Sequence, residues 1–265
     1  MLAHSALLAL GPVGLAELFL VSLIAGIGIT AVGPGGVLMT IGLFALTSLS
    51  PAAVAGTAIV THIGTGLAGT AAFLRSGQLR RREVRRLALI LGASTLIGIP
   101  IGIAVNAQVS RQGFGLLLGL FAAVIGVLVW RRQRRAPPAH RRAPEGMPSL
   151  LPAVAVGLGV AAASSLFGLG GPMVAVPLLV LLHVPLLAAL AAAQAQSVVV
   201  AGTGTIGYAL AGTIDWPVAA FIVVPQVAGV LIGWKIAHSV PTRGLGYALG
   251  GILIALAPYL ALRGG

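Results

Sequence analysis

The sequence contains no cysteine and very few acidic residues. Without cysteine it has no disulfide, no thiolate metal site and no cysteine nucleophile. The acidic residues are Glu17, Glu83, Glu145 and Asp215, and only Glu17 lies near the start of a predicted membrane segment. A cation pump or proton antiporter usually needs a carboxylate inside the membrane, so this scarcity favours an anionic or neutral cargo.

Enzyme motifs are also missing. The sequence has no HExxH, no P-loop ending in GK[ST] and no paired intramembrane aspartates. His4, His140, His183 and His238 are isolated near the terminus, in loops or at a helix end, and do not form a metal site. We therefore expect no enzymatic activity, no metal and no cofactor.

Charged residues make up only 8% of the 265 residues, whereas 58% are hydrophobic. This composition, with a mean hydropathy of +1.08, is typical of a polytopic membrane protein. The apolar runs reach the roughly 20 residues needed to cross a bilayer. The N-terminal sequence lacks the basic region of a cleavable signal peptide, so we expect none.

Twelve of the sixteen basic residues form two clusters that lie between apolar runs. The positive-inside rule predicts that both clusters are in cytoplasmic loops. We therefore attribute most of the net charge of +12 to cytoplasmic loops that orient the protein in the membrane, and we expect no nucleic-acid partner. The clusters are Arg75, Arg80, Arg81, Arg82, Arg85 and Arg86, and then Arg131, Arg132, Arg134, Arg135, Arg141 and Arg142.

Two long apolar segments are interrupted by glycine clusters, one in each half of the chain. The first break is Gly33-Pro34-Gly35-Gly36, and the second is Gly168-Leu169-Gly170-Gly171-Pro172. A broken helix survives in a bilayer only where it lines a cavity or is buried in protein, because its free N–H and C=O groups need partners. Paired interruptions of this kind are typical of transporters built from inverted repeats.

The hydropathy pattern predicts an all-α transmembrane helix bundle of two pseudo-symmetric repeats, each with a broken or re-entrant helix. Half-helix pairs are predicted at 14–32 with 37–48 and at 150–167 with 172–183. Full spans are predicted at 52–74, 84–106, 113–130, 186–211, 216–238 and 244–262. Residues 1–130 and 150–265 would form the two repeats, joined by the basic, proline-rich cytoplasmic linker 131–149.

The halves align at a constant offset of 135 residues. The six arginines that follow 52–74 have no counterpart after 186–211, so these equivalent loops are predicted on opposite sides of the membrane. Such an inverted repeat needs an odd number of crossings in each half, and it places both termini outside the cytoplasm. If each glycine segment crosses the membrane once, the halves are parallel instead. The aligned glycines are Gly33 with Gly168, Gly35 with Gly170, Gly36 with Gly171, Gly77 with Gly212 and Gly98 with Gly233.

The two glycine breaks are the first part of the predicted substrate site. Helices that start after the breaks would direct free N–H groups and positive dipole ends toward them, which suits an anion. The alternative is that glycines only allow close helix packing, which we favour for scattered residues such as Gly64 and Gly66. The predicted residues are Gly33, Pro34, Gly35, Gly36, Gly168, Gly170, Gly171 and Pro172.

Polar side chains on the helices that follow the breaks form the second part of the site. Each can donate a hydrogen bond, and a polar group in lipid is costly without a partner. His62 could also carry a coupling proton, because its charge changes near neutral pH. The alternatives are a neutral histidine that bridges two helices and glutamines that only join helices. The candidates are Thr61, His62, Gln194, Gln196 and Ser197, with Thr57, Thr40 and Gln226 weaker.

Several short motifs, in their order and spacing, resemble the sulfite exporter TauE/SafE family. They are the first glycine break, Ser50-Pro51 followed by Gly56-Thr57, the loop RSGQLRRREVRRL, the segment SSLFGLGGPMVAVPLL and the phrase AGTIDW at 211–216. The resemblance covers about 14–262 and implies a bacterial inner-membrane permease for sulfite, sulfonates or related small anions. The chain departs from the family pattern at Pro34 and Val37, and at 192–194, where AAQ replaces a Gly-Thr-Ser phrase.

We therefore predict a secondary transporter that binds a small sulfur-containing anion near the midplane and moves it by alternating access. One alternative is a membrane-embedded polyprenyl-phosphate phosphatase, which would need clustered Glu, Arg and Ser at the breaks. Another is an anion channel, which would need a continuous polar lining. The expected partners are the anion, the lipid bilayer and a coupling proton, and the sequence does not predict the oligomeric state.

Overall fold

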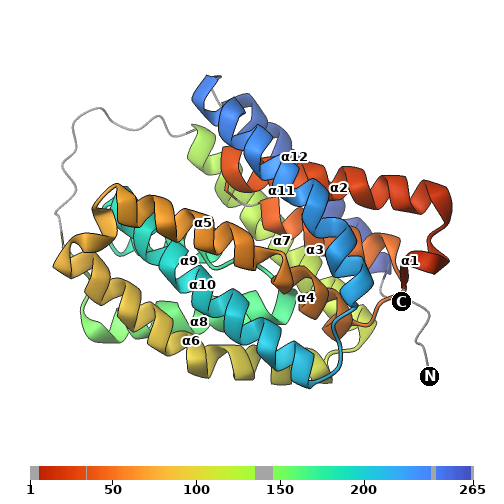
Figure 1. The fold of residues 1–265 in the computed structure, drawn as a ribbon, viewed down its shortest axis with the longest axis horizontal. Helices are drawn as coiled ribbons and strands as arrows, with labels where there is room; N and C mark the ends of the chain where they lie inside the picture. Colours follow the sequence, from red (N-terminus) through yellow and green to blue (C-terminus); the bar gives the residue numbers. More distant parts are fainter. Residues whose placement is uncertain (1–5, 34, 135–145, 240–242, 264–265) are drawn as a thin grey trace.

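The computed structural model describes residues 6–33, 35–134, 146–239 and 243–263, and the regular secondary structure in these ranges is helical (Figure 1). Eight helices in these ranges are long and apolar enough to cross a membrane. The predicted polytopic helix bundle is therefore confirmed. The elements are α1 (Ala6–Ala9), α2 (Gly11–Ala31), α3 (Gly35–Leu46), α4 (Pro51–Val60), α5 (His62–Arg75), η1 (Gln78–Arg80), α6 (Arg82–Gln108), α7 (Arg111–Arg134), α8 (Leu150–Phe167), α9 (Pro172–Leu181), α10 (Leu186–Leu210), α11 (Trp216–Ser239) and α12 (Arg243–Arg263).

The two glycine breaks separate helices of unequal length. Before the breaks, α2 has 21 residues and α8 has 18. After them, α3 has 12 residues and α9 has 10. The sequence predicted a pair of half-helices at each break, whereas the structure has a span-length helix followed by a short one. The short helices α3 and α9 are the elements that begin inside the bundle.

The predicted single helix at 52–74 is interrupted at Thr61, between α4 and α5. Its start agrees with the prediction, because the Ser50 hydroxyl accepts a hydrogen bond from the N–H of Ala53 and Pro51 occupies the first turn. At the interruption, the Thr61 hydroxyl donates to the carbonyl of Ala58, and the Thr61 N–H bonds the same carbonyl. A local bond of this kind competes with the regular helix ladder and explains the break.

Helices from the two halves interlock along glycine-lined contacts. A Cβ atom added at Gly26 of α2 would clash with the backbone oxygen of Gln226 on α11. In the same way, a Cβ at Gly102 of α6 would clash with the backbone of Ala162 on α8. Helices approach this closely only where a residue has no side chain. Gly26 and Gly102 therefore serve helix packing, whereas Gly64, for which the sequence also favoured packing, has no neighbour within 4 Å of an added Cβ.

Helices that align at the predicted offset of 135 residues run in opposite directions. Gly56 of α4 faces Tyr208 of α10, and Gly69 of α5 faces Gln194 of α10. Residue numbers therefore rise along α4 and α5 while they fall along α10, which means that these helices are antiparallel. The helices α7 and α12 are antiparallel too, because Gly115 faces Leu260 whereas Gly126 faces Gly250. At the offset of 135 residues, 52–74 aligns with 187–209 and 113–130 with 248–265.

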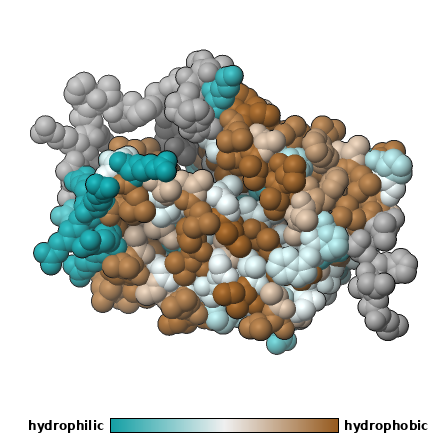
Figure 2. All heavy atoms as spheres, in the orientation of Figure 1, coloured by the Kyte–Doolittle hydropathy of each residue, from teal (hydrophilic) through white to brown (hydrophobic). Residues whose placement is uncertain are grey.

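The face drawn in Figure 2 is largely apolar, and its most hydrophilic residues lie mainly at one end. Large apolar side chains on the outside include Leu89, Ile97 and Leu120, each more than half exposed. A surface of this kind suits lipid contact, because a soluble monomer rarely exposes such large apolar patches. In Figure 2 the hydrophilic side chains gather at the end where α5 meets α6. This is the end that holds the first arginine cluster.

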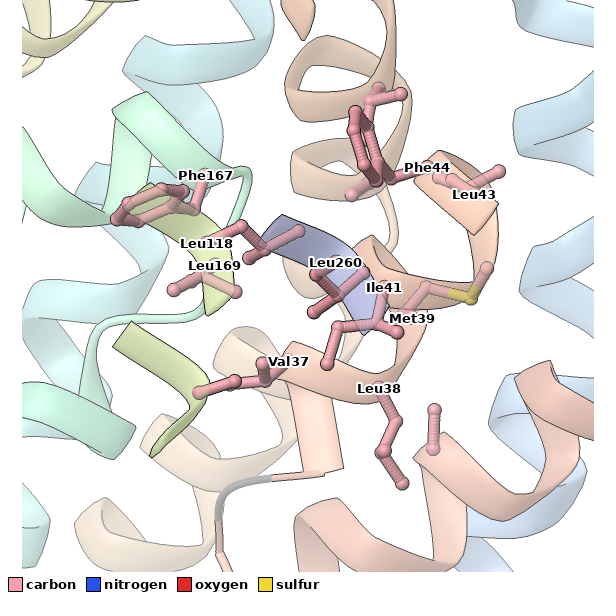
Figure 3. Close-up of a cluster of buried hydrophobic side chains, with 14 of the residues drawn as sticks. Val37, Leu38, Met39, Ile41, Leu43, Phe44, Leu118, Phe167, Leu169 and Leu260 are labelled. Carbon is pink, nitrogen blue, oxygen red and sulfur yellow. The ribbon is translucent and has the colours of Figure 1, made fainter. Parts of the chain in front are cut away.

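The short helix α3 lies in the middle of the core. All ten residues from Gly35 to Phe44 are buried. Its apolar side chains meet residues of α7, α12 and the end of α8 (Figure 3). The rings of Phe44 and Phe114 lie 5.5 Å apart, and those of Phe114 and Phe167 lie 5.8 Å apart. These contacts hold α3 in place, with its N-terminal end inside the bundle.

Candidate functional site

His62 lies between the two glycine breaks. It is the first residue of α5, near the centre of the candidate span Pro51–Arg75, and its side chain is 3% exposed. A Cβ atom added at Gly36 would lie 2.9 Å from Cε1 of His62, and one added at Gly170 would lie 3.1 Å from Nδ1. The imidazole therefore lies against the backbone of both breaks, and a side chain at either glycine would press on the ring.

The N-terminal ends of two short helices lie beside this imidazole. Gly36 lies in the first turn of α3, and Gly170 and Gly171 lead into α9. The first N–H groups of a helix have no partner within that helix and carry the positive end of its dipole. Pro172 contributes no N–H, so the donors at the second break come from the glycines and from Met173. Two helix N-termini thus meet at one histidine.

The ring of His62 holds an unpaired polar atom. Its Nε2 is buried and has no hydrogen-bond partner among the described residues. The helices α3, α4 and α9 contain no Asp, Glu, Lys or Arg, and neither does α10. A buried polar atom without a partner is costly, and in this position it can be satisfied by a ligand. The donors around it, together with the absence of carboxylates, suit an oxyanion.

Ser197 extends the site toward α10. A Cβ atom added at Gly171 would lie 3.4 Å from Cα of Ser197, and one added at Gly66 would lie 3.4 Å from its hydroxyl oxygen. Ser197 is buried, and at the repeat offset of 135 it is the counterpart of His62. The structure therefore places Gly36, His62, Gly170, Gly171 and Ser197 close together, and their role in substrate binding stays a prediction.

Three of the predicted glycines shape the breaks. Gly33 has φ = +114° and Gly168 has φ = +73°, a left-handed region that favours glycine. Gly168 also packs directly on the backbone of Ala55, where a side chain would not fit. Gly35 packs on the backbone of α2 at Ala25, so its role is helix packing. Pro34 lies outside the described residues.

Four predicted side chains contact residues other than His62. Thr57 accepts a hydrogen bond from the N–H of Asp215 and so joins α4 to the loop before α11. Nε2 of Gln196 donates to the Thr95 hydroxyl and to the Gly157 carbonyl, which joins α10 to α6 and α8. The side chain of Gln194 packs against Gly69, two helical turns beyond His62 along α5. Thr61, next to His62, bonds back to Ala58.

Two polar residues at the second break were missed or ranked low by the sequence analysis. The Thr40 hydroxyl of α3 donates to the carbonyl of Phe167 at 2.9 Å, so the short helix of one half is tied to the break of the other. The Ser164 hydroxyl is fully buried, and it has no hydrogen-bond partner among the described residues. The only sequence signal was the position of Ser164, one helical turn before Gly168.

Comparison with known proteins gives one match. The sequence profile described as "Sulfite exporter TauE/SafE" matches residues 18–260. No curated protein and no solved structure matches the chain significantly. The matched region contains both glycine breaks, His62 and every helix from α3 to α11. The chain therefore belongs to the sulfite exporter TauE/SafE family of membrane transport proteins.

Proposed function

We propose that the protein is a secondary transporter of a small sulfur-containing anion, such as sulfite or an organosulfonate, in the bacterial inner membrane. The observation that carries this proposal is the buried, unpaired Nε2 of His62 between Gly36 and Gly170. Family membership supports transport, and the absence of carboxylates around His62 supports an anion over a cation. The substrate would accept hydrogen bonds from His62 and from the N–H groups at the starts of α3 and α9.

Alternating access is the mechanism that this arrangement supports. The imidazole of His62 fills the space between the breaks, so the anion binds when the side chain turns or when the breaks move apart. Each break belongs to a different half of the chain, and equivalent helices of the halves run antiparallel. We infer an inverted repeat whose halves rock about the site and expose it to each side in turn.

His62 also supports proton coupling. The other titratable side chains on the elements around His62 are Tyr208 on α10, which bonds the carbonyl of Ser165, and Arg75 at the far end of α5. The protonation state of His62 therefore sets the charge of the site. A protonated imidazole and a bound monoanion form a neutral pair, and holding this pair in the membrane interior costs less free energy than holding an anion alone. We infer that proton and anion move together.

Catalysis is not proposed. A phosphatase-type enzyme would need acidic and basic groups at the breaks, and the described residues of α3, α9 and the second break contain neither. Transport also agrees with the family.

Flux measurements in proteoliposomes test the proposal. Labelled sulfite, taurine-type sulfonates and thiosulfate would be measured with and without a pH gradient, in the wild type, His62→Gln and His183→Asn. His183 is the matched control, because it lies at a helix end with φ = +64°, a conformation that asparagine tolerates. We expect flux of at least one anion, stimulated by the gradient in the wild type and His183→Asn but not in His62→Gln. Absence of flux for all three anions contradicts the transport proposal, whereas gradient-stimulated flux in His62→Gln contradicts the coupling role alone.

A further inference from the structure

Two arginines occupy the end of the bundle that lacks the arginine clusters. Among the described residues, the other basic positions lie where α5 ends, α6 begins, α7 ends, α11 ends and α12 begins. Arg111 instead begins α7 and Arg263 ends α12. The helices α7 and α12 are antiparallel, so these two arginines lie at the same end. By the positive-inside rule this is the extracytoplasmic end, where arginine is unexpected without a specific role.

Arg111 lies across the C-terminal end of α3. Its guanidinium donates to the carbonyls of Phe44 and Thr47, each at 3.0 Å, and to the carbonyl of Leu49. It also lies 4.6 Å from the centre of the Phe44 ring. These bonds satisfy carbonyls at the end of a buried helix and oppose the negative end of its dipole. Three of the five guanidinium N–H groups are used, which leaves two for another acceptor.

Arg111 and Arg263 line one recess of about 480 Å³, together with Thr47, Ser48, Leu46 and residues around α1. No Asp or Glu lines it among the described residues. The nearby carboxylate of Asp215 already accepts hydrogen bonds from the N–H groups of Ala6 and Val218. Arg263 donates to the hydroxyl of Tyr259, and its side chain is exposed. Among the residues that the structure describes, the lining of the recess thus has two positive charges, two hydroxyls and no carboxylate.

We propose that this recess binds an oxyanion. Guanidinium groups bind phosphate and sulfur oxyanions through paired hydrogen bonds, and two arginines without a carboxylate form a site of the matching charge. The recess is a second site, separate from His62, because α3 lies between them and its 12 residues span about 18 Å. The same chemistry is offered by a free oxyanion in water and by the phosphate of an anionic lipid headgroup.

The experiment compares Arg263→Gln with Arg134→Gln. Arg134 is a matched control, because it stacks on Trp130 at 5.3 Å as Arg263 stacks on Tyr259 at 5.5 Å, but at the other end of the bundle. One arm measures binding of labelled sulfate in nanodiscs of phosphatidylcholine alone. The other uses native mass spectrometry to count phosphatidylglycerol molecules that stay bound during delipidation. Neither substitution is at the His62 site, so a difference in ligand binding between the two variants reports on the recess.

For a free oxyanion, we expect Arg263→Gln to bind sulfate at least about threefold more weakly than Arg134→Gln. For a lipid headgroup, Arg263→Gln loses a phosphatidylglycerol that Arg134→Gln retains. Equal behaviour of the two variants in both arms overturns the proposal. Arg111→Lys provides a second check, since lysine keeps the charge but not the planar fork, and it should weaken the same ligand. Both results are independent of whether the His62 site transports an anion.

Discussion

At the scale of single residues, the site depends on His62 and on the absence of side chains around it. The sequence identified His62 because it is a titratable residue at the centre of a predicted span. It also identified Gly36 and Gly170, because glycines cluster where a helix is interrupted. It could not separate the glycines that contact His62 from Gly35, which packs on α2. That distinction depends on which neighbour each glycine faces, and a single sequence does not contain it.

Gln196 provides the first residue-scale prediction. Gln196→Leu removes the hydrogen bonds to Thr95 and Gly157 but leaves His62 and both breaks untouched. Hydrogen bonds between membrane helices average about 0.6 kcal/mol each, so stability should fall by about 1 kcal/mol. Thermal unfolding in detergent would measure this loss, and the KM for the transported anion should stay within about twofold of wild type. A rise in KM of tenfold or more would place Gln196 in the anion site instead.

At the scale of helices, hydropathy predicted the spans well but not how they pair. The predicted boundaries agree with the structure to within a few residues for most spans, because long apolar runs between charged loops define them. The interruption at Thr61 was not predicted, because a threonine that bonds back to Ala58 gives no distinct pattern. The pairing of α2 with α11 was not predicted either, because glycines lie along many faces of these helices.

The glycine contact between α2 and α11 leads to an element-scale prediction. Gly26→Ala adds a methyl group that clashes with the backbone oxygen of Gln226 and pushes the two helices apart. Overpacking of this kind costs about 1–3 kcal/mol. The matched control is Gly159→Ala on α8, where an added Cβ meets nothing within 4 Å. Thermal unfolding in detergent should show a lower melting temperature for Gly26→Ala alone. Equal melting temperatures would show that the α2–α11 contact adapts freely.

At the scale of the whole molecule, the central prediction is that the halves have opposite orientations. The chain has no cysteine, so single cysteines can be introduced without removing native ones. Ser76 follows α5 and Ala211 follows α10, both are exposed, and they are related by the repeat offset of 135 residues. A membrane-impermeant maleimide should label Ser76→Cys only from the cytoplasmic side and Ala211→Cys only from the opposite side. Labelling of both cysteines from one side would contradict the inverted repeat.

The most direct test of the account is anion binding to variants of the two breaks. Gly36→Ala and Gly170→Ala each place a methyl group against the His62 ring, whereas Gly159→Ala adds one in open space. None of the three glycines has a positive φ, so the backbone tolerates alanine at each position, and differences in affinity should report the site rather than backbone strain. With the transported anion and purified protein in nanodiscs, we predict that Gly36→Ala and Gly170→Ala each bind at least about tenfold more weakly, ~1.4 kcal/mol, and that Gly159→Ala binds like the wild type. Wild-type affinity in both break variants would contradict an anion site at His62.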